Sequence, residues 1–264
     1  MAYQQLMVDF DGAVATIRLN NPARLNALSA TMTEELLEVL EGMAKDRSVR
    51  AILLTGEGRG FSSGADLTAL QDPYLKGERP KLSFFLKEGY NRLIPLLTET
   101  PKPVVAAING VVAGAGVSLA LACDYRVASE DASFSMAFVR IGLIPDAGSS
   151  YLLPRTVGAA RALELAMLSE KVTAERALEI GLVNRVVPAE KLMDEARELC
   201  RGLAGQPTAA IGLTKRMFQE ASRLSLRETL DREAEVQDEA AATNDHLEGV
   251  LAFLEKREPV FTGT

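Results

Sequence analysis

The sequence predicts an α/β fold in which buried strands alternate with amphipathic helices, followed by a C-terminal layer of helices. Two observations support this prediction. Short apolar runs at 50–55 and 104–108 each follow a helical pattern, and each precedes a glycine-rich segment. Beyond about residue 159 the pattern is almost entirely helical. Strands separated by helices indicate crossover connections and therefore a mainly parallel sheet.

The chain is expected to open with a β-hairpin, because residues 3–9 and 13–19 alternate apolar and polar positions around Asp11 and Gly12. The next helix has candidate N-cap residues in Ser29 and Thr31. The elements expected after the hairpin are a helix from Ser29 or Thr31 to about Lys45, a strand at 50–55, a helix at about 82–99, a turn at 100–103, a strand at 104–108 and a helix near 117–122.

We expect residues 1–200 to form a core that holds the ligand site, and residues 201–264 to form a helical region that mediates oligomerisation. Amphipathic helices that follow a closed α/β core need a partner surface for their apolar faces. A further segment, 71–80, has the composition of a loop.

Composition and charge exclude several classes of function. The net charge of −7 and the absence of a basic cluster argue against a nucleic-acid partner. No apolar run reaches the length of a membrane span, and the N-terminus does not resemble a signal peptide, so we expect no membrane partner and a cytoplasmic location. Because His246 is the only histidine, we expect neither a Cys/His metal site nor a Ser-His-Asp triad.

Two glycine-rich segments, 56–67 and 109–124, follow predicted strands, where open α/β sheets usually place their ligand sites. Glycine lets a backbone approach a ligand closely, and a helix that begins after such a loop directs free N–H groups at negative charge. The alternative is that the glycines serve only tight turns and close packing. Neither segment completes a Walker A or a dinucleotide-binding motif.

The ordered motifs of the chain closely resemble the crotonase superfamily over nearly its whole length. The resemblance implies a crotonase-like spiral of repeated ββα units with a C-terminal helical layer, an acyl-CoA substrate and a homotrimer or a hexamer made of two trimers. The motifs are NNPARLNAL (20–28), GRGFSSGADL (58–67), KPVVAAINGVVAGAGVSLALACD (102–124), IGLIPDAGSSYLLPR (141–155), GLVNRVV (181–187) and EGVLAFLEKREPVFTG (248–263).

Carried over by motif position, the resemblance implies that the main-chain N–H groups of Ser63 and Ala115 form an oxyanion hole for a thioester enolate. Loss of one such donor typically costs about 2.7–4 kcal/mol of transition-state stabilisation. The resemblance also implies contacts with coenzyme A. The residues at those positions are Arg24, Ala65, Asp66, Leu67, Phe253 and Lys256, the last two reaching the CoA of a neighbouring subunit. For Asp66, helix capping is an equally good interpretation.

The catalytic glutamates of the family's hydratases are missing. Their positions fall on Ser118 and Phe138, which we place in the substrate pocket, and neither residue can serve as the usual acid or base of water addition. The sequence offers Asp146 instead, between an apolar Ile-Pro pair and a small-residue turn, where its pKa could be raised. The competing interpretation is that Asp146 caps the helix that begins near Ser149.

The combination of MAF-x-x-IGLIPD with AGAG is similar to an isomerase branch of the superfamily, which includes ring 1,2-epoxyphenylacetyl-CoA isomerase and 3,2-enoyl-CoA isomerases. By this resemblance Asp146 moves a proton between two carbons of a bound acyl-CoA, and no cofactor is needed because coenzyme A is part of the substrate. Three alternatives remain open: an enoyl-CoA hydratase with an atypical acid, a CoA-thioester hydrolase, and a non-catalytic acyl-CoA-binding paralogue.

Overall fold

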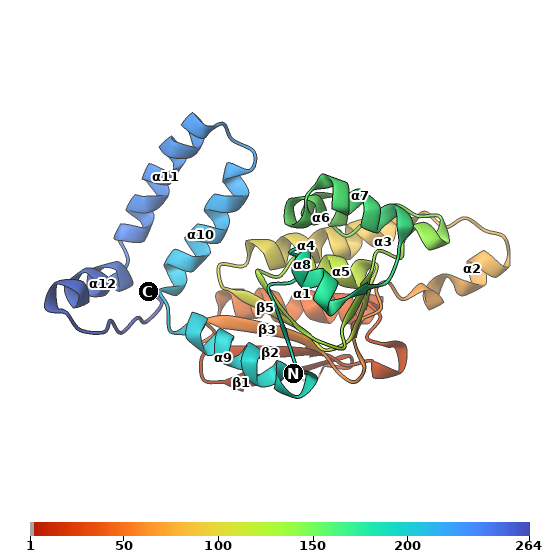
Figure 1. The fold of residues 1–264 in the computed structure, drawn as a ribbon, viewed down its shortest axis with the longest axis horizontal. Coiled ribbons are helices and arrows are strands. Elements are labelled where there is room, and N and C mark those ends of the chain that lie inside the picture. Colours follow the sequence, from red (N-terminus) through yellow and green to blue (C-terminus); the bar gives the residue numbers. More distant parts are fainter. Residues whose placement is uncertain (1–2) are drawn as a thin grey trace.

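A computed structural model describes residues 3–264, and it contains two sheets with helices around them (Figure 1). The larger sheet has six strands in the order β1-β2-β3-β5-β7-β10, and the smaller has four in the order β4-β6-β8-β9. The strands are β1 (Leu6–Asp11), β2 (Val14–Leu19), β3 (Ala51–Gly56), β4 (Gly60–Ser62), β5 (Val104–Ile108), β6 (Val111–Ala113), β7 (Tyr125–Ser129), β8 (Ser133–Ser135), β9 (Val172–Thr173) and β10 (Arg185–Val187).

Three successive strand pairs form the repeating unit of the fold. In each pair the first strand joins the larger sheet and the second joins the smaller one: β3 with β4, β5 with β6, and β7 with β8. Within each sheet, strands from successive pairs are parallel. Helical segments follow every pair, so the chain advances as a spiral of ββα units. The predicted fold class is therefore confirmed.

The N-terminal elements agree with the sequence patterns. Strands β1 and β2 form the expected antiparallel hairpin, with Asp11 paired to Val14 across a turn in which Gly12 has φ of 57°. Helix α1 (Ala30–Lys45) begins after Ser29, whose hydroxyl accepts a hydrogen bond from the N–H of Met32. Ser29, and not Thr31, is therefore the N-cap.

Elsewhere the structure differs from the predicted elements. The helix expected at 82–99 is divided at Gly89 into α3 (Leu82–Glu88) and α4 (Tyr90–Glu99), since glycine is a weak helix former and here adopts non-helical angles. The short strands β4 and β6 lie inside the segments predicted as loops, and β9 and β10 interrupt the region predicted as helical. Strands of two or three residues leave little periodicity in a sequence.

The C-terminal helices extend away from the sheets, at the end of the molecule opposite α2 (Gln71–Leu75) (Figure 1). Helix α9 packs on β3, β5 and β7 of the larger sheet, whereas α10 and α11 pack mainly on each other. Among residues 3–264 no helix is both long and apolar enough to cross a membrane. The helices after β6 are α5 (Ala115–Leu121), α6 (Ser149–Val157), α7 (Ala159–Leu168), α8 (Ala174–Glu179), α9 (Leu192–Ala204), α10 (Thr208–Ala221), α11 (Leu226–Ala241) and α12 (Asn244–Glu255).

Candidate active site

The two glycine-rich segments lie side by side because their short strands pair. Strands β4 and β6 are parallel neighbours, with Gly60 opposite Val111 and Ser62 opposite Val112. Parallel strands end at the same edge of their sheet, so the residues that follow Ser62 and those that follow Ala113 emerge together. The ligand site predicted between these segments therefore has its two halves in contact.

This contact is made by backbone, and side chains at the glycines would prevent it. A Cβ added at Gly64 would lie 2.6 Å from the oxygen of Ala113 and 3.1 Å from the nitrogen of Ala115. A Cβ added at Gly116 would lie 2.3 Å from the oxygen of Ser62. Real Cβ atoms do not approach backbone this closely, so the glycines fix the distance between the two main chains.

The hydrogen bonds distinguish three main-chain N–H groups at this contact. The N–H of Ala115 lies at the first position of α5, and neither it nor the N–H of Ala65 donates to any acceptor in the described part of the chain. In contrast, the N–H of Ser63 donates to the oxygen of Leu25 at 2.8 Å. Ser63 is therefore engaged in holding its own loop, and the free donor on this side is Ala65, two residues later.

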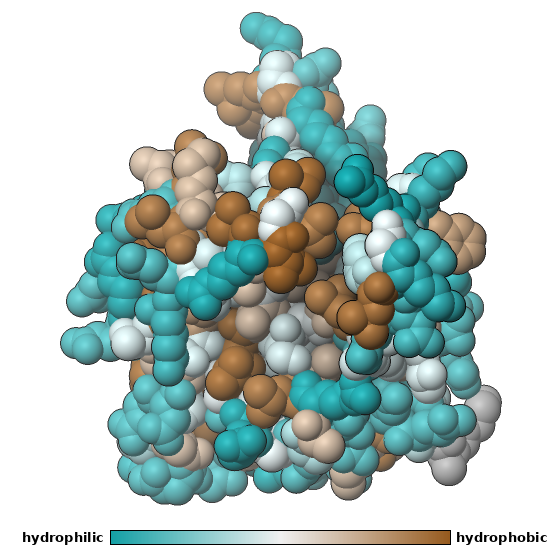
Figure 2. Space-filling view, turned by 90° about the vertical axis from the view of Figure 1, so that its right-hand side faces the viewer, coloured by the Kyte–Doolittle hydropathy of each residue, from teal (hydrophilic) through white to brown (hydrophobic). Residues whose placement is uncertain are grey.

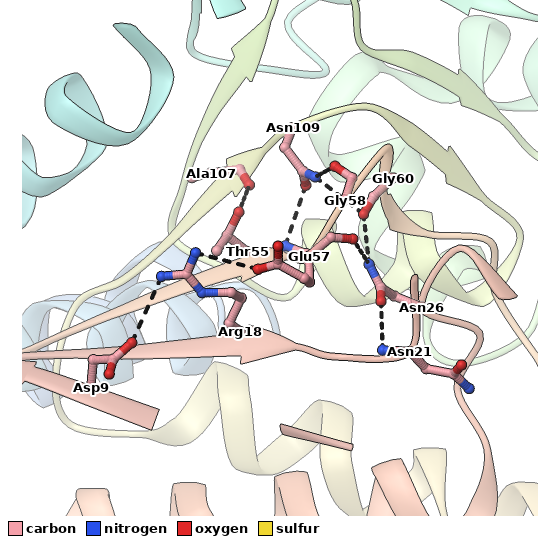
Figure 3. Close-up of polar contacts among 11 residues, drawn as sticks. Asp9, Arg18, Asn21, Asn26, Thr55, Glu57, Gly58, Gly60, Ala107 and Asn109 are labelled. Atoms are coloured by element: carbon pink, nitrogen blue, oxygen red, sulfur yellow. Dashed lines mark hydrogen bonds and ion pairs between the residues drawn. The ribbon is translucent and has the colours of Figure 1, made fainter. Parts of the chain in front are cut away.

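Two asparagine side chains hold the loop between β3 and β4 in place (Figure 3). The buried amide of Asn26 donates to the oxygens of Glu57 and Gly60, at 2.9 and 2.7 Å. The amide of Asn109 donates to the oxygen of Gly58 at 2.9 Å. The sequence prediction assigned no role to either asparagine, although both lie in the quoted motifs. The only sequence signal for them is their position beside a glycine-rich loop, where an asparagine side chain can hydrogen-bond to backbone groups that lack another partner.

Ser118 connects the acid candidate to the helix that presents Ala115. Its side chain is fully buried, and its hydroxyl donates to the main-chain oxygen of Asp146 at 3.1 Å and lies 2.5 Å from the hydroxyl of Ser149. Ser118 is one helical turn after Ala115 on α5. It therefore supports the turn that contains Asp146, and it does so from a position closed to solvent.

The carboxyl group of Asp146 lies in a partly buried position, and one of its oxygens, Oδ1, is buried without a hydrogen-bond partner among the described residues. Burial raises the pKa of Asp146 from 3.8 to about 6. The residue at the N-cap of α6 is Gly148, and no side chain caps this helix. The capping interpretation of Asp146 is therefore wrong, and only its main-chain oxygen accepts the N–H of Ser149, at 2.9 Å.

Four of the six residues expected to contact coenzyme A lie together. Arg24 and Asp66 form an ion pair at 3.4 Å, and Ala65 and Leu67 flank Asp66 along the chain. Asp66 also caps the short 3₁₀ helix Leu67–Leu70 by accepting the N–H of Thr68 at 3.0 Å, so its capping interpretation is confirmed. Phe253 and Lys256 are not brought to this group, because α12 lies at the opposite end of the molecule from α2 (Figure 1).

Apolar side chains gather on the face of the molecule that carries α2 and α3 (Figure 2). Phe138 is buried, and its ring lies 3.9 Å from the position of a Cβ added at Gly114. Phe138 is therefore next to the turn that presents Ala115. The exposed apolar side chains contributed by α2, α3 and residues 139–144 are Tyr74, Leu75, Phe84, Phe85, Val139, Ile141 and Ile144.

Similarity to known proteins identifies the family. A family model described as enoyl-CoA hydratase/isomerase matches residues 9–264. The chain belongs to the enoyl-CoA hydratase/isomerase family. It is 45% identical over 251 residues to the 1,2-epoxyphenylacetyl-CoA isomerase of Escherichia coli K12, covering 95% of each chain. It is also 41% identical to a probable enoyl-CoA hydratase of Rhodobacter capsulatus over 263 residues, covering 100% of each.

Solved structures of enoyl-CoA hydratase/isomerase family members agree with this fold. The crystal structure of a putative enoyl-CoA hydratase from Streptomyces coelicolor A3(2) superposes with a TM-score of 0.92 at 36% identity, covering 100% of this chain and 96% of that one. The resemblance read from the sequence motifs is thereby confirmed. Relatives named as isomerases and as hydratases are both present, so the reaction of this family member has to be argued from its own site.

Proposed function

We propose that this family member is an acyl-CoA isomerase that moves a proton between two carbons of the acyl group through an enolate, with Asp146 as its single acid and base. The observation that supports this most directly is the environment of the Asp146 carboxyl group. Burial raises its pKa to about 6, one of its oxygens has no partner among the described residues, and its turn is tied to the helix of Ala115. A group with such a pKa can both accept and return a proton near neutral pH.

In the proposed reaction, the charged carboxylate of Asp146 takes a proton from C2 of the bound thioester. The electron pair moves onto the thioester oxygen, which accepts hydrogen bonds from the main-chain N–H groups of Ala115 and Ala65. Asp146 then returns the proton at C4, and the double bond shifts from C3–C4 to C2–C3. Ala65 takes the place first predicted for Ser63, because the Ser63 N–H already has an acceptor.

Hydration is disfavoured by the same site. Water addition in its usual form needs a second carboxylate, and the two family positions hold Ser118 and Phe138. The hydroxyl of Ser118 is engaged with Asp146 and Ser149, and Phe138 has no ionisable group. The proposed isomerisation needs no resident cofactor, since coenzyme A arrives with the substrate. We also propose that the protein assembles as a homotrimer or a hexamer, in which Phe253 and Lys256 reach the CoA of a neighbouring subunit.

The test is to incubate the protein with cis-3-hexenoyl-CoA and, separately, with trans-2-hexenoyl-CoA, and to measure product mass. We expect the first to give trans-2-hexenoyl-CoA of unchanged mass and the second to gain no water. The Asp146→Asn variant should lower the isomerisation rate by about 10² to 10⁴, the usual effect of losing acid–base catalysis. A rapid gain of one water by the 2-enoyl thioester would refute the proposal, as would an Asn variant with wild-type kcat.

A further inference from the structure

Tyr90 has a hydroxyl group that is only weakly engaged at the edge of the site. Its hydroxyl lies 3.3 Å from the oxygen of Leu28, which is long for an O–H donor. The same oxygen already accepts the N–H of Asp66 at 3.2 Å. Replacing this contact with a better acceptor on a ligand would therefore cost little.

Tyr90 lies on a helix that contacts both the Ala65 segment and the turn of Asp146. Leu28 forms a parallel bridge with Ala65, so the tyrosine hydroxyl is next to the strand segment that presents the Ala65 N–H. Ile94, one helical turn after Tyr90 on the same face of α4, lies against Gly148, where an added Cβ would be 3.1 Å from the Ile94 Cγ2 atom. Gly148 belongs to the turn of Asp146. Helix α4 thus places Tyr90 next to the Ala65 segment and, through Ile94, packs against the turn of Asp146.

The surroundings of the phenol keep it protonated. Burial raises the pKa of Tyr90, and the negative charges of Asp146 and then Asp66 raise this pKa further. A neutral phenol beside two carboxyl groups acts as a hydrogen-bond donor, and it takes no part in removing a proton from carbon. The site therefore contains a donor that the proposed proton transfer does not use.

We propose that Tyr90 is a specificity-determining residue that selects acyl groups carrying an oxygen acceptor next to the carbons between which the proton moves. An epoxide or ether oxygen at C3 or C4 of the acyl group would accept from the Tyr90 hydroxyl. An acyl group without that oxygen would leave the hydroxyl with only its long bond to Leu28. Sites that contain a hydrogen-bonding group for a substrate discriminate against the analogue that lacks the partner. This inference rests on the proposed isomerase function, which defines the two carbons between which the proton moves.

Calorimetric titration can test the inference without turnover. We would measure the affinities of 3,4-epoxyhexanoyl-CoA and hexanoyl-CoA for the full-length protein carrying Asp146→Asn, and then add either Tyr90→Phe or Tyr125→Phe. Tyr90→Phe removes one oxygen atom and leaves the ring that packs against the core. Tyr125→Phe makes the same change on β7 of the larger sheet, where the Tyr125 ring is also partly buried against apolar side chains, and it is the matched control.

We expect the Asp146→Asn parent to prefer the epoxide, and Tyr90→Phe to reduce this preference by about fivefold, the usual effect of one neutral hydrogen bond. Tyr125→Phe should leave the preference unchanged. The inference is overturned if the parent binds both thioesters with equal affinity. It is also overturned if Tyr90→Phe leaves both affinities unchanged or lowers both by the same factor. These titrations are independent of the turnover of cis-3-hexenoyl-CoA, so failure of the isomerase proposal is seen separately.

Discussion

The hydroxyl of Ser118 donates a hydrogen bond to the main-chain oxygen of Asp146 at a distance of 3.1 Å. This bond joins α5, whose first residue presents one of the proposed enolate donors, to the turn that holds the proposed acid. In the family's hydratases the same position carries a catalytic glutamate, as the resemblance of the motifs implies. Ser118, whose hydroxyl is a poor acid or base, thus holds the main chain of the Asp146 turn against α5.

We predict that Ser118→Ala lowers the free energy of unfolding by about 1–2 kcal/mol, because it leaves the buried hydroxyl of Ser149 without this partner. It should also lower kcat, since the main-chain oxygen of Asp146 loses one of its two hydrogen-bond donors. Urea unfolding and steady-state kinetics would measure both effects.

The double variant Ser118→Ala/Ser149→Ala distinguishes a lost partner from a general packing defect. Replacing both partners should cost less than the sum of the single changes, because no hydroxyl is then left unpaired. Ser133→Ala is the control, since Ser133 is also a buried serine but takes no part in the contact between Ser118, Ser149 and Asp146. Strictly additive losses would contradict the proposed pairing.

The course of the chain could be predicted from sequence where periodicity is long. Helix α1 and strands β3 and β5 follow from their apolar patterns and, for α1, from the cap at Ser29. The short strands β4 and β6 could not be predicted, because three residues rich in glycine, serine and small apolar side chains have no distinctive pattern. Their pairing is non-local, and it is what brings the two glycine segments together.

The sequence indicated candidate residues for the site but not the hydrogen bonds that they make. Asp146 was identified because the sequence lacks the usual glutamates, and its unpaired oxygen agrees with that choice. The choice of Ser63 as a donor depended on motif position alone. Only the structure reveals that the N–H of Ser63 donates to the oxygen of Leu25, since a contact between residues 38 positions apart leaves no local signal in the sequence. Tyr90 was missed for the same reason.

The burial of Asp146 should be measurable as a cost in stability that depends on pH. Its pKa is raised from 3.8 in the unfolded chain to about 6 in the folded protein, so the folded state retains the proton to higher pH. The contribution of this carboxyl group is most favourable below pH 3.8 and is lost as the pH rises through about 6. Asparagine does not ionise.

We therefore predict that the free energy of unfolding of Asp146→Asn, relative to that of wild type, increases as the pH rises from about 4 to about 6. Above that range the difference should stay constant. Urea unfolding at a series of pH values would provide the measurement. A difference that is flat over this range, or one that shrinks as the pH rises, would mean that the carboxyl group is solvated in the folded protein.

The C-terminal helices should form the interface between subunits. Phe253 on α12 is 81% exposed and Phe218 on α10 is 77% exposed, although α10 and α11 pack mainly on each other. Sedimentation at micromolar concentration should show a trimer or a hexamer. Phe253→Glu should reduce the assembled fraction, because a charge would be buried in an apolar contact. Leu75→Glu, an equally drastic change on exposed α2, is the control. A stable wild-type monomer would contradict the prediction.

The last prediction separates the two candidate donors on the first glycine loop. An amide-to-ester replacement removes one N–H while keeping the side chain, and it can be introduced with an α-hydroxy acid at position 63 or at position 65. At Ala65 the lost N–H has no acceptor in the described chain, so its loss should affect mainly the enolate. We expect kcat to fall by about 10²–10³, which is typical of removing one oxyanion donor.

At Ser63 the lost N–H is the donor to Leu25, so the ester should lower the free energy of unfolding by about 0.5–1.5 kcal/mol. Its effect on kcat should be much smaller than that at position 65. Both esters weaken the preceding carbonyl as an acceptor, which affects the bond from the Leu28 N–H to the Gly64 oxygen in the Ala65 ester. Stability therefore falls in both proteins, and kcat distinguishes them. A larger loss of kcat at position 63 would restore Ser63 as the donor and would require its bond to Leu25 to break when substrate binds.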